Sequence, residues 1–137
     1  MKKTDADNRP EIVVDFNCDH GLLTICLKNI GARSAYRVRT EFDKRFCGLG
    51  GAKCISEMRL FRSLEYIPPG KEFHQFIDTL GNYAKRKEPM RIKVAVTYRD
   101  RDGNHYQDSM MHDLRIYLEL GQATISGQLK EDRAWRR

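Results

Sequence analysis

The segment LKNIGARSAYRVRTEF, residues 27–42, decides the fold because it sets a turn between two stretches that alternate apolar and polar residues. Asn and Gly accept the left-handed backbone conformation that other residues resist, so Asn29-Ile30-Gly31 predicts a chain reversal. Before it, Leu23, Ile25 and Leu27 share one face; after it, Tyr36, Val38, Thr40 and Phe42 are expected to face inward, with Arg37, Arg39 and Glu41 facing water. This period of two is typical of half-buried β-strands, and the turn lets the two strands lie in different layers.

The same alternation predicts strands along most of the chain. They are expected over residues 11–16, 22–28, 36–42, 55–61, 73–77, 90–99 and 106–118. Asp100-Arg101-Asp102-Gly103 predicts a tight hairpin before the last strand, whose alternation slips at Met110-Met111 and so predicts a β-bulge. Residues 79–89 are polar and predict a loop. About seven strands without a helical repeat predict an all-β fold, an immunoglobulin-like antiparallel β-sandwich.

The core of this sandwich is expected to contain residues from the inward faces of several strands. They include Ile25, Val38, Phe42, Val94, Val96 and Ile116. Truncating one of them to alanine is expected to cost about 2 to 4 kcal/mol of folding free energy.

Length and composition predict a single domain. The chain has 137 residues, of which 40% are hydrophobic and 32% charged, an ordinary balance for a soluble protein. We expect a flexible segment over residues 1–10, the β-sandwich over residues 11–119, and a basic tail over residues 120–137 that is either a short helix or disordered. No apolar run approaches the roughly 18 residues of a membrane span, and the N-terminus lacks the apolar region of a signal peptide. A cytoplasmic location is therefore expected.

The side chains that could ligate a metal are poorly spaced for that role. Cys18, His20, Cys47 and Cys54 lack the separation of about two to four residues that paired zinc ligands show. Met110-Met111-His112 offers soft ligands for copper, and Asp100, Asp102 and Asp108 could collect calcium, but a strand irregularity and a solvated turn explain these sets more simply. We therefore expect no metal and no cofactor. Without an export signal, the four cysteines, Cys26 among them, are expected to be reduced thiols.

No recognisable motif for catalysis is present. The histidines available for proton transfer are His20, His74, His105 and His112. None of them lies in a nucleophile motif, and the chain has no Gly-x-Ser-x-Gly, His-Glu-x-x-His or phosphate-binding loop sequence. The run Gly48-Leu49-Gly50-Gly51 lacks the strand and helix that flank a phosphate loop. We therefore expect no enzymatic activity and no catalytic residue.

Four segments together resemble a known class of domain. They are LTICLKNIGARSAYRVRTEF at residues 23–42, LEYIPPGKEF at residues 64–73, VAVTYRDRDGNHY at residues 94–106 and HDLRIY at residues 112–117. Across residues 11–119 their order resembles bacterial immunoglobulin-like β-sandwich modules and is similar to the CARDB and fibronectin type III-like domains. The resemblance implies the sandwich fold and a role as a spacer, an adhesin or a docking platform, and it implies no particular activity.

A basic surface is expected on one sheet, in keeping with the net charge of +6. In an immunoglobulin-like sandwich the third, sixth and seventh strands lie side by side. That arrangement sets Arg37 and Arg39 beside Lys93 and Arg99, with Lys85, Arg86 and Lys87 near one end of the same strand. Arginine there can bind phosphate or carboxylate, although charged side chains also simply keep a sheet face soluble. The tail adds Arg133, Trp135, Arg136 and Arg137, which suit an anionic membrane surface or a nucleic-acid base.

Three functions remain open, in order of preference. The first is a non-catalytic protein-interaction or accessory module that presents a sheet face or a strand edge to a protein partner, or to a neighbouring domain of a longer chain. The second is a module that binds nucleic acid or an anionic surface through the basic sheet face. The third is a small metal-binding protein or enzyme. The sequence predicts no oligomeric state.

Overall fold

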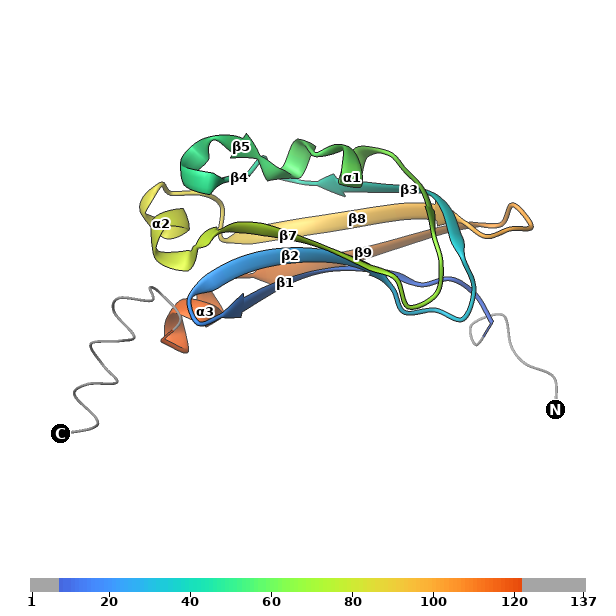
Figure 1. Cartoon of the computed structure of the whole chain (residues 1–137), viewed down its shortest axis with the longest axis horizontal. Coiled ribbons are helices and arrows are strands. Elements are labelled where there is room, and N and C mark those ends of the chain that lie inside the picture. The colour runs from blue at the N-terminus through green and yellow to red at the C-terminus, as the bar shows by residue number, and fades with distance from the viewer. Residues whose placement is uncertain (1–7, 122–137) are drawn as a thin grey trace.

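Two antiparallel sheets form the body of the molecule in the computed structural model, which describes residues 8–121 (Figure 1). The three-stranded sheet has the order β1-β2-β7, with bounds Ile12–Asp19, Leu22–Asn29 and Glu72–Thr79. The four-stranded sheet has the order β6-β3-β8-β9, with bounds Leu64–Ile67, Ala35–Phe42, Arg91–Arg99 and His105–Asp113. The buried apolar side chains of both sheets belong to one cluster, which confirms the predicted all-β, immunoglobulin-like sandwich. The predicted neighbourhood of its third, sixth and seventh strands is also confirmed, as β3, β8 and β9.

Shorter elements connect the strands, and most of them lie at one end of the sandwich (Figure 1). They are the hairpin of β4 (Cys47–Gly48) and β5 (Lys53–Cys54), and the helices α1 (Arg59–Arg62), α2 (Leu80–Lys85) and α3 (Arg115–Glu119). In Figure 1 the β4–β5 hairpin, α2 and α3 lie toward the left end of the sandwich, whereas the β8–β9 hairpin projects at the right end. The two ends of the sandwich are therefore built from different elements, separated by the length of β8.

The turn at residues 29–31 works through side-chain bonding and close approach. The Asn29 side chain donates to the carbonyls of Arg33 (2.8 Å) and Ile67 (3.1 Å), and it accepts from the backbone of Glu11 (3.2 Å) and Gly31 (2.9 Å). A Cβ atom on Gly31 would overlap the backbone at residues 9–11. Neither Asn29 nor Gly31 has a positive φ, so the predicted left-handed conformation is wrong. The turn is therefore held by hydrogen bonds of the buried Asn29 amide, and it needs glycine at position 31 because a larger residue would not fit.

The core lies between the sheets and agrees with the alternation of β2, β3 and β8. Ile25, Val38, Val94 and Val96 are at most 1% exposed, as predicted. Phe42 is half-buried and packs against the same cluster. The prediction for Ile116 is wrong, because the chain leaves the sheet after Asp113 and this side chain lies on α3, where it is 50% exposed.

Two segments form elements other than the predicted ones. Residues 55–61 form a 3₁₀ turn followed by α1, so the strand expected there is wrong. Ile55, Met58 and Phe61 pack on the core at a spacing of three residues, which suits helical turns better than a strand. Residues 79–89, expected as a loop, begin with α2, whose first turn is capped by the Thr79 hydroxyl accepting from the Asn82 N–H at 3.2 Å.

The last strand is shorter and more regular than expected. Its pairing with β8 runs without interruption from Arg91 opposite Asp113 to Arg99 opposite His105. The bulge predicted at Met110-Met111 is therefore wrong: Met110 packs against the core while Met111 points outward and is 53% exposed. The register shifts instead in β3, between Tyr36 and Arg39, and between β2 and β7 at Leu23/Thr24.

Both edges of the three-stranded sheet are at least partly covered. On the free edge of β1, His112 Nε2 lies 2.9 Å from the Val14 carbonyl and the Tyr117 hydroxyl donates to that of Phe16 at 3.1 Å. Beside β7, the β4–β5 hairpin approaches so closely that a Cβ on Gly48 would overlap the Ile77 carbonyl. Such coverage limits pairing with a further strand.

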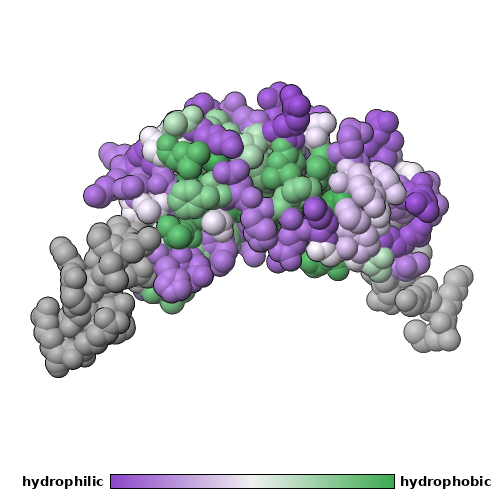
Figure 2. Space-filling view, in the orientation of Figure 1, coloured by the Kyte–Doolittle hydropathy of each residue, from purple (hydrophilic) through white to green (hydrophobic). Residues whose placement is uncertain are grey.

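The surface carries both apolar and hydrophilic areas. On the face drawn in Figure 2, apolar patches occupy the middle and hydrophilic residues surround them. Within residues 8–121, no helix is long and apolar enough to cross a membrane.

Candidate functional site

The irregularity in β3 creates the candidate site. Arg37 lies within the register shift between β3 and β8, and its φ is +50°, in the left-handed region. For a residue other than glycine this conformation costs about 1 to 2 kcal/mol. The shift keeps Val38 in the core and leaves Arg37 exposed next to Tyr36, which pairs with Arg99 of β8. Strained backbone that is held by surrounding structure concentrates at functional sites.

We call the resulting hollow the arginine pocket. It has a volume of about 350 Å³ and is lined by Tyr36, Arg37, Arg99, Asp100, Arg101 and Gly103. These residues come from β3, the end of β8 and the hairpin that follows it. A hollow of about 220 Å³ shares Tyr36 and Arg101 with it and adds Arg33 and Ser34. Tyr36 is therefore surrounded by arginines from three different chain segments.

The one carboxylate in the lining, Asp100, is fully engaged in shaping the hairpin. Its Oδ1 accepts from the N–H groups of Asp102 and Asn104, both at 2.9 Å. Its Oδ2 accepts from the Asn104 amide at 2.9 Å and the Tyr106 hydroxyl at 2.8 Å. Burial opposes ionisation of Asp100, but these hydrogen bonds outweigh it and lower the pKa of the carboxyl below its ordinary value. The ionised Asp100 side chain thus stabilises the turn through these hydrogen bonds.

The arginines that line the pocket are not held by partners of opposite charge within it. Within residues 8–121, Arg37, Arg99 and Arg101 form no ion pair, and Arg33 reaches only the exposed carboxylate of Asp102, at 3.6 Å. Guanidinium groups present a planar fork of donors that matches carboxylate and phosphate. Three unpaired cations around one hollow are therefore suited to bind an anionic group.

Two tyrosines extend the site along the outer face of the four-stranded sheet. The rings of Tyr36 and Tyr66 lie 5.3 Å apart, and the Tyr66 hydroxyl is 3.5 Å from the Ser34 hydroxyl. Tyr66 is 48% exposed, whereas Tyr36 is half-buried and lies outside the core cluster, so its predicted inward position is wrong. Tyrosine and arginine together are typical of the residues that dominate binding interfaces.

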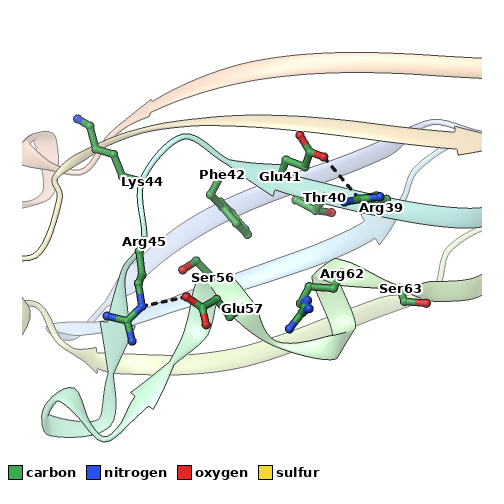
Figure 3. Close-up of a pocket in the computed structure, with 10 residues that line it drawn as sticks. All are labelled: Arg39, Thr40, Glu41, Phe42, Lys44, Arg45, Ser56, Glu57, Arg62 and Ser63. Atoms are coloured by element: carbon green, nitrogen blue, oxygen red, sulfur yellow. Dashed lines mark hydrogen bonds and ion pairs between the residues drawn. The ribbon is translucent and has the colours of Figure 1, made fainter.

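A larger hollow lies elsewhere, between β3 and the segment that contains α1. This β3–α1 cleft has a volume of about 600 Å³ and is shown in Figure 3. Arg45 pairs with Glu57 across 2.9 Å, Arg39 lies 3.5 Å from Glu41, and Lys44 donates to the Arg91 carbonyl at 3.0 Å. Two ion pairs thus engage four of the cleft's charged side chains, and Lys44 and Arg62 form no ion pair with a described residue. The smaller arginine pocket has three arginines without such an ion pair.

The seven predicted binding residues do not form one site. Arg37 and Arg99 meet in the arginine pocket, while Arg39 and Lys93 are exposed farther along the outer face of the same sheet. The other three are Lys85, Arg86 and Lys87, on and after α2 at the opposite end of β8. Arg86 is tied down by Asp78 (2.6 Å), Glu88 (3.5 Å) and the Cys47 carbonyl (3.1 Å). The predicted tail residues Arg133, Trp135, Arg136 and Arg137 lie outside the described residues.

Sequence reasoning missed Tyr36, Arg101 and Arg33 as members of the site. Strict alternation predicts that Tyr36 faces inward, because an alternating pattern cannot reveal the register shift between Tyr36 and Arg39. The hairpin that positions Arg101 is predicted from its Asp-Gly pair, and an arginine next to such a turn is the available signal. Arg33 follows the turn at residues 29–31, and nothing in its local pattern points to the hairpin.

The groups considered for metals and catalysis lie apart. His20 lies in the β1–β2 turn, His74 on β7, and His105 and His112 at opposite ends of β9. Cys18 faces the core, whereas His20 is exposed. In the part of the chain that the structure describes, no group of three or more His, Cys, Asp or Glu side chains is arranged to hold a metal ion.

Comparison with known proteins places the chain in a family. Residues 1–118 match the family model described as Domain of unknown function (DUF8453), so the chain belongs to this family. No curated protein and no solved structure matches the chain. The likeness to CARDB and fibronectin type III-like domains stays a prediction.

Proposed function

We propose that the chain is a non-catalytic protein-interaction module whose arginine pocket takes up a carboxylate or another anionic group of a protein partner. The observation that carries the proposal is the set of three guanidinium groups, from Arg37, Arg99 and Arg101, that surround one hollow without an ion pair to any residue of the described chain. The single carboxylate in the lining, Asp100, is already bound within the hairpin, so the three arginines leave a net positive charge that can attract an anionic group.

A sheet face supports the proposal better than a strand edge. The edges at β1 and β7 are partly covered, by side chains of His112 and Tyr117 and by the β4–β5 hairpin. The outer face of the four-stranded sheet carries the arginine pocket and the exposed ring of Tyr66. A partner that lies on this face reaches a charged pocket and an aromatic contact at once.

A protein partner fits the charge pattern better than a polyanion. Binding along a phosphate backbone needs a track of cations, and affinity grows with each phosphate that is neutralised. Here Glu41 interrupts the face beside Arg39, and Lys85 and Lys87 lie at the other end of β8. Three arginines without an ion pair to a described residue line the arginine pocket, and this arrangement suits a single acidic side chain or a short acidic segment.

Nucleic-acid binding is the second candidate, and one observation favours it. The paired rings of Tyr36 and Tyr66 lie beside the arginines, and bases stack on exposed aromatic rings next to cationic groups. The two candidates differ in how they respond to salt, because added salt opposes the counterion release that drives nucleic-acid binding.

Selection from a random peptide display library tests the first candidate even though the partner is unidentified. We expect the selected peptides to share acidic residues and to bind at about 150 mM salt, where long-range attraction is screened. A short oligo(dT) serves as the nucleic-acid probe, and we expect it to bind weakly under the same conditions. Selected peptides without acidic residues would contradict the proposal, and tight, strongly salt-dependent oligo(dT) binding would favour the second candidate. The cytoplasmic location expected from the sequence stays a prediction.

A further inference from the structure

The β4–β5 hairpin holds two cysteines directly opposite one another. Cys47 of β4 pairs with Cys54 of β5, and both are half-buried. Opposite residues of an antiparallel pair have Cα atoms about 4.5 to 5.5 Å apart. Disulfides span Cα separations of about 4.4 to 6.8 Å, so the backbone already has the spacing that a disulfide needs.

The two thiols also lie close to each other. They interact electrostatically, and Cys54 Sγ lies 3.7 Å from the Ser56 hydroxyl and 3.9 Å from the Phe46 carbonyl. The Arg45 guanidinium lies close enough to interact electrostatically with both thiols. The thiolate is the form of cysteine that attacks a disulfide.

We propose that Cys47 and Cys54 form a reversible intramolecular disulfide when the protein meets a small-molecule disulfide. The Cys54 thiolate attacks one sulfur of the oxidant R–S–S–R, forms a mixed disulfide and releases R–S⁻. The Cys47 thiolate then attacks Cys54 Sγ, which forms the Cys47–Cys54 bond and releases the second R–S⁻. The two thiol protons pass to the released thiolates, so two R–SH leave and two electrons reduce the oxidant.

Cys47 suits the second of these steps. Burial, and next the neighbouring Cys54 thiol, raise the pKa of the Cys47 thiol, so the case for this step is made by position. Its backbone is fixed by its N–H donating to Glu88 Oε1 at 3.1 Å and by its carbonyl accepting from Arg86 at 3.1 Å. The attacking sulfur is therefore held beside its target.

The other two cysteines are placed differently. Cys18 and Cys26 are buried, and their strand partners are Leu23 and Asp15. Burial, and to a smaller extent the nearby Asp19 carboxylate, raise the pKa of the Cys18 thiol to about 11. Burial also raises the pKa of the Cys26 thiol. Oxidation should therefore select the hairpin, which lies at the opposite end of the sandwich from the arginine pocket (Figure 1).

Equilibration of the folded chain with glutathione disulfide tests the proposal. Remaining thiols are blocked with N-ethylmaleimide under denaturing conditions, and the sites are mapped by mass spectrometry. We expect maleimide on Cys18 and Cys26, a peptide that links Cys47 to Cys54, and recovery of all thiols after dithiothreitol. The Cys47→Ser variant should instead keep a glutathione adduct on Cys54, because the resolving thiol is gone.

Circular dichroism checks that both proteins are folded before oxidation. Three outcomes would overturn the proposal: all cysteines remain thiols, the wild type keeps a glutathione adduct on Cys54, or disulfides form between protein molecules or involve Cys18 or Cys26. The result is independent of anion binding, because no residue of the arginine pocket contributes to the hairpin.

Discussion

The backbone conformation of Arg37 destabilises the fold, whereas its side chain contributes to the proposed binding site. Its positive φ is unfavourable for any side chain with a Cβ, and its guanidinium forms no ion pair with the described residues. Packing of Val38 in the core fixes the strand on one side of it, and the Tyr36–Arg99 pair fixes the strand on the other. Nothing local in the sequence predicts this conformation, because it results from the shifted register of two strands.

Replacing Arg37 with glycine should therefore stabilise the protein while weakening binding. Glycine accepts a positive φ without a steric penalty, so we expect the unfolding free energy to rise by about 0.5 to 1 kcal/mol in urea titrations. The matched control is Arg39→Gly, two residues on, where φ is not positive. That change should lower the unfolding free energy by about 0.5 to 1 kcal/mol, since glycine weakens an ordinary strand position. A destabilised Arg37→Gly protein would mean that the strain at Arg37 is not real.

Buried ionised carboxylates are the second residue-scale feature. Burial opposes ionisation of Asp78, but hydrogen bonds from the Gly50 N–H (2.9 Å), Arg86 (2.6 Å) and the Thr79 N–H (2.8 Å) outweigh it and lower the pKa of its carboxyl. Asp100 follows the same rule. Both groups bind protons less readily in the folded protein than in the unfolded chain.

Their stabilising effect should be lost in acid. It is fully present above the ordinary carboxyl pKa of 3.8 and disappears as the pH falls through the lower folded values. We therefore expect the urea midpoint to stay level above about pH 5 and to drop below about pH 4, with a shallower drop in the Asp100→Asn variant. The exposed carboxyl of Glu65 provides a control, and Glu65→Gln should keep the wild-type profile. An unchanged profile in Asp100→Asn would refute the role given to Asp100.

At the scale of the elements, long alternating strands were predicted well and short helical segments were not. β2, β3 and β8 were predicted because one face of each is mainly apolar, and this pattern fixes which side is buried. α1 and α2 have four and six residues, too few for a helical period to stand out. Their place in the fold comes from tertiary contacts of Phe61, Leu80 and Tyr83 with the core.

The sequence also did not predict where β9 ends, and a pair of alanine substitutions tests this boundary. Ile25 of β2 is fully buried, whereas Ile116 of α3 is half-exposed. Ile25→Ala should lower the unfolding free energy by about 2 to 4 kcal/mol, because it removes methyl groups from a packed core. Ile116→Ala should change it by less than about 0.5 kcal/mol, as for most surface substitutions. Equal costs in urea titrations would mean that the chain continues as a buried strand past Asp113.

For the candidate site, the sequence predicted the sheet but not the point on it that matters. Arg37 and Arg99 were predicted as neighbours, because β3 and β8 adjoin in this kind of sandwich. Arg101 and Tyr36 join them through a hairpin and a register shift, neither of which an alternating pattern reveals. Arg86 carries the same charge as its neighbours Lys85 and Lys87, but it forms ion pairs with Asp78 and Glu88, which the sequence does not reveal.

At the scale of the whole molecule, the two ends of the sandwich differ in chemistry. The β8–β9 hairpin end carries unpaired arginines, whereas the end with α2 and the β4–β5 hairpin carries Arg86 neutralised by carboxylates and two facing thiols (Figure 1). Exposed lysines are also present there, at Lys85 and Lys87. Charge alone therefore does not distinguish the ends, but the convergence of cations on a pocket does.

The affinity of a display-selected acidic peptide for two matched charge-reversal variants tests this account most directly. Arg37→Glu/Arg101→Glu alters the arginine pocket, and Lys85→Glu/Lys87→Glu makes the same change in net charge at the other end. We expect the first variant to weaken binding at least about tenfold in titration calorimetry and the second to change it less than about twofold, because only the first removes direct contacts. Equal weakening by both variants, or none by the first, would contradict the arginine pocket as the binding site.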